Sequence, residues 1–423
     1  MIKSNLILFC LIILTNYLFA QQDNVFLKRE YWKEKPTLAK VKEDFSKGNS
    51  LSDLDEHDFD AAGWAILENT QNDIIKFIIQ QEGNDVNKLT HDGRTYIFWA
   101  AYKNNLELMN YLINEGARTD LIDSHGYSLV NFCAVTGQLN TEIYDLCIEK
   151  GSVITKEFNK DGASPLLLLI SFMETKDQIT YFTEKGLSLK SLDNLGNNAF
   201  VYAAKSGNMT MMKLLLEMGM DPHVNNDAAL FFAAKGMRKK PNKLPVFKYL
   251  ETLGLNLGSL NKENQNLLHL LSASNKDTVL LKYLMDKGVS MDHTDSKGSA
   301  PISIAVERNN IEALSLYFKN KGDFSVISEG GNSLAHKAVK HQDWKLMELI
   351  IKNDIDINLK NDDGMTVLHL AAMTGESIMF LKKILDAGAD KNITTEFGEN
   401  AYNLVMENEL LNHKIDELKF LIP

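Results

Sequence analysis

Ten histidines and three cysteines are the side chains of this 423-residue chain best suited to bind a metal ion or act as nucleophiles. The histidines contain no His-x-x-x-His pair with a third ligand, which is the spacing of a helical zinc site. His336 and His341 are five residues apart, so they do not share one face of a helix. We therefore expect no metal, no cofactor and no catalytic histidine.

Cys133 and Cys147 each stand among apolar residues. If the helices that carry them pack side by side, a disulfide requires their Cα atoms to lie within about 7 Å. The apolar surroundings favour two buried free thiols, and the disulfide stays the alternative. No His and Asn pattern of a thiol protease accompanies either residue, so neither is expected to be a nucleophile.

Asp-Gly steps such as Asp92-Gly93, Asp161-Gly162 and Asp363-Gly364 carry carboxylates that suggest calcium. They recur about every 33 residues without the ligand ladder of an EF-hand, so they are interpreted as turns. The sequence also has no glycine-rich phosphate loop and no Gly-x-Ser-x-Gly elbow. We expect no catalytic residue and no small-molecule substrate.

The formal net charge of -11 argues against nucleic-acid binding, which needs a basic face. One segment, residues 235–243, runs against this trend because five of its nine residues are basic. It is interpreted as a solvated loop, or as a contact for an acidic partner or a membrane surface. Its basic residues are Lys235, Arg238, Lys239, Lys240 and Lys243.

A repeat of about 33 residues must position all these side chains. Aligning the chain on Gly364 finds turn residues at intervals of 30 to 38 residues. Each turn precedes two short apolar segments with helical spacing, and each segment ends in Gly or Asn, which adopt left-handed backbone readily. The turn positions are 58, 93, 126, 162, 196, 226, 264, 298, 331, 364 and 398. The first helix is expected to end at residues that include Asn104, Gly137, Gly207, Asn275, Asn309 and Gly375.

This pattern resembles the ankyrin repeat. Residues 366–372 match the family's Thr-Pro-Leu-His-x-Ala signature with Val367 in place of Pro, and residues 385–390 match its Leu-x-x-Gly-Ala-Asp ending. The resemblance implies an all-α solenoid of about ten helix-pair units with short β-turn loops over residues 58–422. It also implies that the signature histidines tie each turn to the neighbouring unit. These histidines are His269, His336 and His369.

Residues 21–57 are expected to form an N-terminal capping segment or half-repeat, with Pro36 in the first turn of a helix over residues 37–47. Residues 1–20 read as a signal peptide, because Lys3 precedes the apolar run of residues 6–19 and Ala20 is a small residue at a plausible cleavage point. The run is too short to span a bilayer, so no membrane span is expected after cleavage. Export would place the protein in the periplasm or outside the cell.

The resemblance further implies a concave face, lined by turn tips and by positions late in each first helix. Basic and aromatic residues outnumber acidic ones there, although the chain is acidic. We predict a scaffold that binds a partner protein through this face; the alternatives are a secreted effector that binds a host protein, or an enzyme or toxin with an unrecognised site. The candidate residues are Arg94, Tyr102, Lys103, Tyr127, Phe172, Lys205, Lys235, Arg308, Lys340, His341 and Met373.

Overall fold

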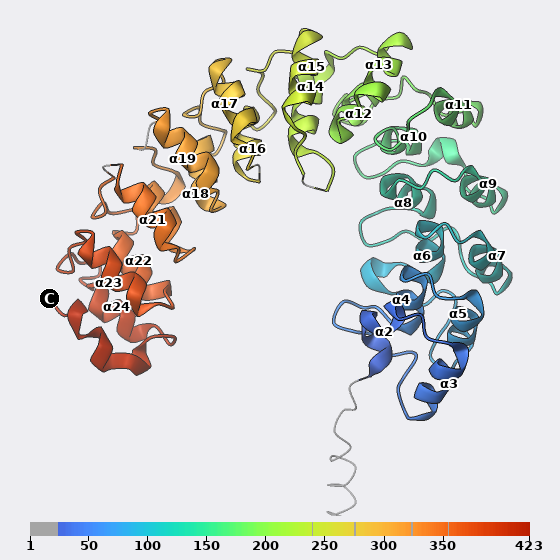
Figure 1. Ribbon diagram of the computed structural model, residues 1–423, viewed down its shortest axis with the longest axis horizontal. Coiled ribbons are helices and arrows are strands. Elements are labelled where there is room, and N and C mark those ends of the chain that lie inside the picture. The colour runs from blue at the N-terminus through green and yellow to red at the C-terminus, as the bar shows by residue number, and fades with distance from the viewer. Residues whose placement is uncertain (1–23, 239, 275, 323–324, 354) are drawn as a thin grey trace, which may run out of the picture. The chain divides into compact units, whose positions relative to one another are not determined.

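The computed structural model describes residues 24–238, 240–274, 276–322, 325–353 and 355–423 (Figure 1). Within these ranges every regular element is an α-helix or a 3₁₀ helix (η), and β pairing is limited to isolated bridges at turns. The chain divides into an N-terminal unit that ends at Leu195 and a C-terminal unit that begins at Gly196. The predicted signal peptide, residues 1–20, lies outside the described residues.

The described N-terminal unit begins with a small cap. Phe26 and Trp32 are fully buried, and the indole Nε1–H of Trp32 donates to the Phe26 carbonyl (2.9 Å). Thr37 is the N-cap of the next helix and its Oγ1 accepts from the Lys40 N–H, so Pro36 precedes the helix instead of lying in its first turn as predicted. The cap consists of η1 (Val25–Leu27), α2 (Arg29–Lys33) and α3 (Leu38–Ser46).

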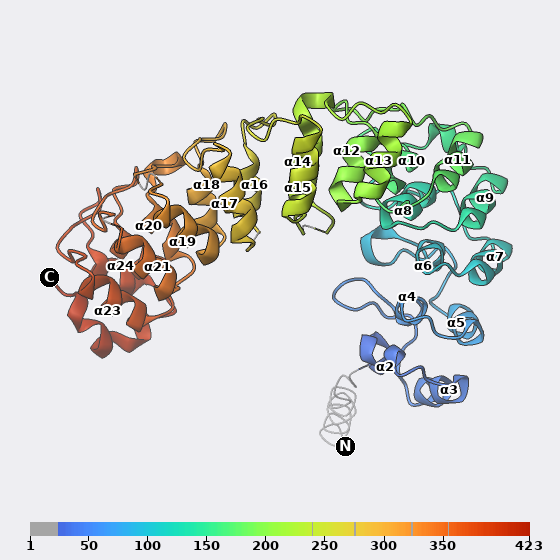
Figure 2. The ribbon, with the colours of Figure 1, turned by 45° about the horizontal axis from the view of Figure 1, so that its top comes forward.

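Pairs of short helices follow in the N-terminal unit. The first helices pack against one another in chain order, and the second helices form a separate row beside them (Figures 1 and 2). The first helices are α4 (Ala61–Leu67), α6 (Tyr96–Tyr102), α8 (Leu129–Thr136) and α10 (Pro165–Leu169). The second helices are α5 (Asn72–Ile79), α7 (Leu106–Asn114), α9 (Thr141–Glu149) and α11 (Lys176–Glu184), and the turns add η2 (His91–Gly93) and η3 (Ile154–Lys156).

The C-terminal unit repeats this arrangement. Its first helices, which pack consecutively, are α12 (Ala199–Ser206), α14 (Val224–Lys235), α16 (Leu267–Ser272), α18 (Pro301–Glu307), α20 (Leu334–Val339), α22 (Val367–Thr374) and α24 (Ala401–Glu407). Its second helices are α13 (Met209–Glu217), α15 (Leu244–Thr252), α17 (Thr278–Asp286), α19 (Ile311–Lys319), α21 (Trp344–Ile351) and α23 (Ile378–Asp386), with η4 (Glu329–Gly331) at a turn and η5 (Asn412–Leu421) at the end. None of the helices in the described part of the chain is long and apolar enough to cross a membrane.

The turns explain why the helices stay short. All eleven turn positions inferred from the sequence have a positive φ, between 55° and 84°. This left-handed conformation suits Gly, Asn and Asp, and it redirects the chain ahead of the regular part of each first helix. Side chains of Asn, Ser, Thr or Asp then cap most helices, as Asn105 does by accepting from the Leu108 N–H (3.0 Å).

Two kinds of hydrogen bond recur between neighbouring repeats. At the turns, the Ser124 N–H donates to the Asp92 carbonyl (2.8 Å). Near the second helices, the Gln138 side-chain amide donates to the Ala101 carbonyl at the end of the preceding first helix (2.8 Å). The turn bond recurs from Asn194 to Asp161, Ser296 to Glu263 and Asp362 to Gly330, and the amide bond recurs from Asn310 to Ser272 and Asn408 to Ala372.

Gly375 departs from the expected left-handed helix end. Its φ is −75° and its ψ is 158°, so the chain leaves α22 in an extended conformation. The next residue, Glu376, donates its N–H to the side-chain oxygen of Gln342 in the preceding repeat (2.8 Å). This bond to a neighbouring repeat directs the chain away from the helix, which the local pattern of glycines did not reveal.

The basic segment lies between α14 and α15, within one helix pair. Asn242 anchors it, because the Asn242 amide donates to the Ala204 carbonyl (3.1 Å), the Lys205 carbonyl (3.0 Å) and the Ala233 carbonyl (3.1 Å). Met237 and Lys240 form an isolated β bridge closer to its start. The segment is therefore tied both to its own first helix and to the preceding one.

The space around Gly137 and Gly126 shows how closely the repeats pack. Gly137 and Gly126 have nearly the same φ, 83° and 82°, but a Cβ at Gly137 would lie 2.5 Å from the Phe172 ring while a Cβ at Gly126 would have nothing within 4 Å. Gly126→Ala is expected to cost about 1 kcal/mol through backbone strain, and Gly137→Ala about 1–3 kcal/mol more through overpacking. Urea unfolding of both variants measures the difference, and equal midpoints would refute the predicted contact.

Candidate functional site

The candidate residues in the N-terminal unit occupy different environments at the first-helix ends. Tyr102 is 38% exposed, its ring lies 6.2 Å from that of Phe132, and the Lys103 ammonium lies over it at 5.9 Å. Phe172 is partly buried because its ring packs on Gly137 of the preceding repeat. Tyr102 and Lys103 are thus available to a partner, whereas Phe172 also holds two repeats together.

Arg94 lies inside the N-terminal unit instead of on its surface. It is only 9% exposed, and its guanidinium pairs with Asp92 (2.9 Å) and with Asp123 of the following repeat (2.8 Å). The guanidinium also stacks over the Phe132 ring at 4.6 Å. Tyr127 is partly buried, and its backbone N–H donates to Asp123 (2.9 Å). Arg94 is therefore assigned a structural role, whereas the Tyr127 side chain is partly accessible.

Three further candidates lie late in the C-terminal unit. Lys340 is exposed at the end of α20, and Met373 is 40% exposed in α22. His341 is partly buried, and its Nε2 lies 3.0 Å from the Glu307 carbonyl oxygen of the preceding repeat. Of these three residues, Lys340 and Met373 are exposed.

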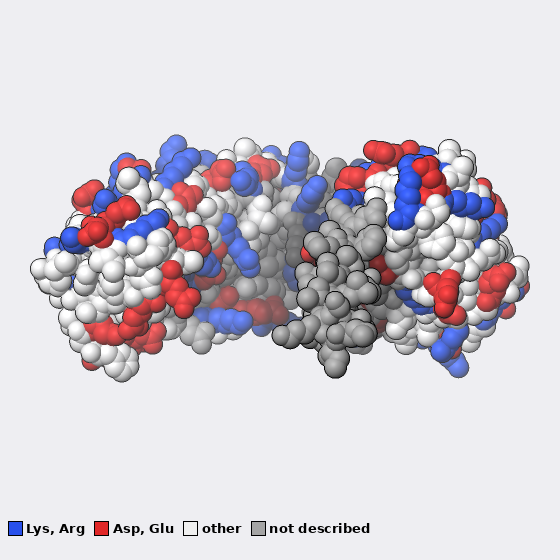
Figure 3. Space-filling view, turned by 90° about the horizontal axis from the view of Figure 1, so that it is seen from below, with Lys and Arg blue, Asp and Glu red and all other residues white. Residues whose placement is uncertain are grey.

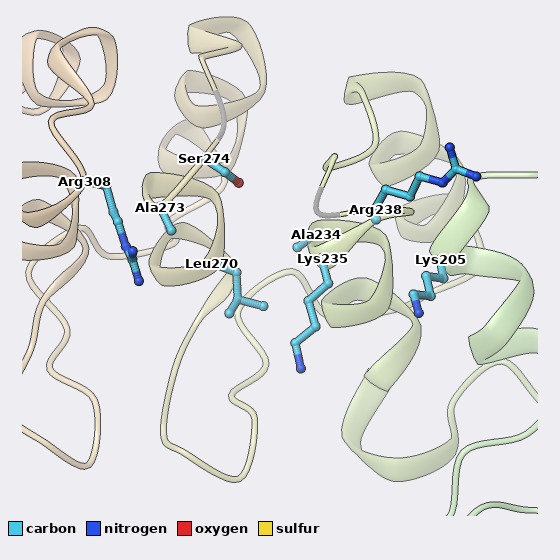
Figure 4. A pocket seen from close by; sticks show the side chains of 9 residues that line it. Lys205, Ala234, Lys235, Arg238, Leu270, Ala273, Ser274 and Arg308 are labelled. Atoms are coloured by element: carbon cyan, nitrogen blue, oxygen red, sulfur yellow. The ribbon is translucent and has the colours of Figure 1, made fainter. Parts of the chain in front are cut away.

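The remaining candidates come together around one cavity of about 640 Å³ in the C-terminal unit (Figure 4). Lys205 comes from α12, Lys235 from the end of α14, and Arg308 from the C-cap of α18. Arg238 of the basic segment joins them, so residues that are far apart in the sequence share one lining. Lys240 and Lys243 of the segment are exposed elsewhere, and Lys239 lies outside the described residues.

The cavity has an apolar floor and a cationic rim. Figure 4 shows Leu270 between Lys235 and Arg308, and the floor continues over Ala234 and Ala273. No acidic side chain is among the described residues that line it. By contrast, Lys and Arg lie among Asp and Glu on the face shown in Figure 3. The cavity is therefore a local concentration of positive charge.

The three signature histidines connect successive turns. In His336, Nδ1 accepts from the Ser333 N–H (3.2 Å) and Nε2–H donates to the Met365 carbonyl (2.9 Å). His369 does the same with the Thr366 N–H (3.0 Å) and the Ile393 carbonyl (3.0 Å). His269 reaches the Ser299 carbonyl (3.1 Å). Each ring thus links its own helix cap to the segment that leads into the next repeat.

Cys133 and Cys147 are free and buried. Burial raises the pKa of both thiols, that of Cys147 to about 12. A thiol that stays protonated in apolar surroundings is a poor nucleophile. Among the described residues, no three His, Cys, Asp or Glu side chains are grouped so that they could hold a metal ion.

The N-terminal unit also has a row of exposed apolar side chains that was not predicted from the sequence. Each lies four residues before a turn position in five successive repeats, and their exposed fractions range from 42% to 65%. Exposed apolar residues that recur together mark candidate contact surfaces. Comparing the residue four positions before the turn in every repeat would have identified them. The residues are Leu54, Leu89, Ile122, Phe158 and Leu192.

Comparison with known families supports the repeat assignment. The family described as ankyrin repeats (3 copies) matches residues 63–157 and 302–395, and a single ankyrin repeat matches residues 195–224. Together these ranges take in about half of the chain. The matches fall in both structural units.

Curated relatives carry the same type of repeat. An ankyrin repeat protein of Acanthamoeba polyphaga mimivirus is 25% identical over 378 residues, which cover 84% of this chain and 45% of that protein. Phosphocholine transferase AnkX of Legionella pneumophila is 23% identical over 79% of this chain and 33% of its own length. The p105 subunit of nuclear factor NF-kappa-B from Gallus gallus is 26% identical over 48% of this chain and 21% of its own length. The chain spans less than half the length of each of these relatives.

Because the three signature histidines are buried, we expect the free energy of unfolding to depend on pH. Burial is the main cause that lowers the pKa of His269, His336 and His369 from the ordinary 6.5. Below about pH 6.5 the unfolded chain therefore binds more protons than the folded chain, so the free energy of unfolding falls as pH falls. Asn occupies the equivalent position at Asn403, where its Oδ1 accepts from the Asn400 N–H (3.0 Å) without titrating.

His336→Asn and His369→Asn are expected to flatten the dependence of stability on pH between about pH 7.5 and about pH 5.5. Urea unfolding at several pH values measures this slope. Lys297→Glu, a change at an exposed residue of the same unit, serves as the control. Identical slopes in the wild type and the histidine variants would contradict the prediction.

Proposed function

Because the chain belongs to the ankyrin-repeat family, whose repeats are protein-interaction scaffolds, we propose that it binds a partner protein through the exposed ends of its first helices. The observation that carries the proposal is the cavity at the ends of α14, α16 and α18, where cationic side chains meet around an apolar floor. Arg is among the residue types enriched at interaction hot spots, which cluster in well-packed pockets that exclude water.

The charge of the cavity residues supports a role in binding. Lys235, Arg238 and Arg308 form no ion pair with a residue that the structure describes. Elsewhere many cations are paired across repeats, as Lys88 is with Asp60 (2.8 Å) and Lys337 is with Glu307. Three cations that the fold leaves without carboxylate partners are available to a ligand.

The alternatives differ in destination or in chemistry. A secreted effector would bind a host protein through the same surface. An enzyme would need a catalytic group, and the match to a phosphocholine transferase covers only a third of that protein. The two buried thiols and the signature histidines His336 and His369 lack the exposure that a catalytic role requires. The binding scaffold is therefore the function that the geometry favours.

The location of the protein is part of the proposal. Lys3, the apolar residues 6–19 and Ala20 support cleavage by a signal peptidase, followed by residence in the periplasm or outside the cell. Such a place would expose the scaffold to envelope or extracellular partners.

Affinity capture tests the binding face. The wild-type chain, used as bait with the fraction of the producing cells that contains it, is expected to recover a defined partner. Tyr102→Glu, Lys205→Glu and Arg308→Glu combined are expected to lower this recovery severalfold, because they reverse or remove the contacts at the first-helix ends. Lys297→Glu, placed at a turn, is the matched control. Equal recovery by all three baits would refute the assignment of the face.

Fractionation and N-terminal sequencing test export. The mature chain is expected in the periplasm or the medium with Gln21 as its first residue. Ile12→Arg places a charge in the apolar run and is expected to leave the uncleaved chain inside the cell. A wild-type chain that begins at Met1 and fractionates with the cytosol would overturn the export proposal.

A further inference from the structure

We propose that the cavity binds one kind of ligand: an extended acidic segment of a protein, in which an apolar side chain is flanked on both sides by carboxylates. This inference rests on the proposed scaffold function and adds the chemistry of the occupant. The cavity walls are supplied by Lys205, Lys235, Arg238, Leu270 and Arg308.

The rim of the cavity carries cations that no described carboxylate neutralises. Lys235, Arg238 and Arg308 are exposed and have no ion-pair partner among the described residues, and the carboxylate next to Arg308, that of Glu307, is paired with Lys337. A ligand with carboxylates would therefore meet cations that are not already neutralised. Guanidinium groups bind carboxylates in two-point contacts, so two of the three are well suited to this.

The floor of the cavity is apolar. Leu270 and Ala273 are only partly buried, and both line the cavity. A site for a bare inorganic anion would gain nothing from this surface. An apolar side chain placed on Leu270 would remove it from water, which stabilises a complex by about 25 cal/mol per Å² of area buried. The combination of floor and rim points to a side chain with carboxylates around it.

Hydrogen bonds fix the segment that carries Arg238 before a ligand binds. Arg238 belongs to the inserted segment, which the Asn242 amide fixes to the carbonyls of Ala204, Lys205 and Ala233. The bridge between Met237 and Lys240 closes the loop that carries Arg238. A backbone segment that is fixed before binding loses less conformational entropy in the complex than a free loop. The insertion therefore acts as one wall of the site.

The spacing of Lys235 and Arg308 along the stack sets the length of the ligand. Lys235 at the end of α14 and Arg308 at the end of α18 lie two repeats apart. Packed helices are about 8–10 Å apart, so the helices that carry the two cations are about 16–20 Å apart along the stack. An extended chain advances about 3.3 Å per residue, so this distance corresponds to about five or six residues. Carboxylates two or three residues on either side of an apolar residue would reach both cations.

The negative net charge of the chain makes the binding of an acidic peptide selective for the cavity. The net charge of −11 repels an acidic peptide at long range, and screening confines attraction to a Debye length of about 8 Å at physiological salt. Binding of such a peptide to this acidic chain would therefore report the cavity and not a general basic surface.

Fluorescence anisotropy with labelled synthetic peptides tests the proposal on the purified full chain. The main probe has one Phe with two Asp or Glu residues on each side. Two further peptides replace the Phe by Ser, or the acidic residues by Asn and Gln. We expect the main probe to bind about tenfold more tightly than either, and its affinity to fall as NaCl is raised.

Matched variants locate the binding. Arg238→Glu and Arg308→Glu are each expected to weaken the main probe about tenfold, while Lys262→Glu, at an exposed turn of the same unit, has no effect. Leu270→Ala is expected to weaken the Phe peptide but not the Ser peptide. Circular dichroism melting confirms that each variant is folded.

The outcomes separate this inference from the proposed function. Equal affinity for the Phe and Ser peptides, together with competition by citrate, would show a site for small anions and overturn the peptide assignment. No binding, or binding unchanged in Arg238→Glu and Arg308→Glu, would overturn it as well. If a partner is captured by the scaffold but recovery survives both charge reversals, the proposed function stands and this inference fails.

Discussion

The constraint on which the structure depends is that one pair of short helices cannot bury its own apolar face. Each first helix is covered only when the next one packs against it, as α6 is covered by α4 and α8. Tyr96 shows how completely this happens, because its side chain is fully buried and its hydroxyl donates to Asp60 of the preceding repeat (2.5 Å). Stability and spacing therefore arise between repeats, and each repeat must present the same faces as its neighbours.

Most of the fold follows from features that are local in sequence. Turn positions such as Gly364 and Asn226 recur at the period, and their positive φ needs only a residue that tolerates it. The contacts that could not be predicted involve two repeats. Gly375 is extended because Glu376 bonds to Gln342, thirty-four residues away. Arg94 has the composition of a binding residue, but Asp123 of the next repeat removes it from the surface.

The candidate site shows the same division. Lys205, Lys235 and Arg308 could be selected from sequence because the period places them at equivalent first-helix ends. That they share one cavity with Arg238 depends on the path of the insertion, which Asn242 sets through bonds to another repeat. The exposed row that includes Ile122 and Phe158 was equally periodic, but it lies before the turns, where apolar residues are easily taken for core.

Cross-repeat pairing also explains why an acidic chain can present a cationic site. The carboxylates of Asp60, Asp123 and Glu307 neutralise cations of adjoining repeats, so those cations join neighbours instead of meeting a ligand. At the ends of α14 and α18, Lys235 and Arg308 form no such pair with a described residue, since the core constraint acts on the buried faces. A position free of packing demands can change its charge without cost to the stack. The unpaired cations at Lys235 and Arg308 occupy such positions, which is where a scaffold can acquire selectivity while its fold is preserved.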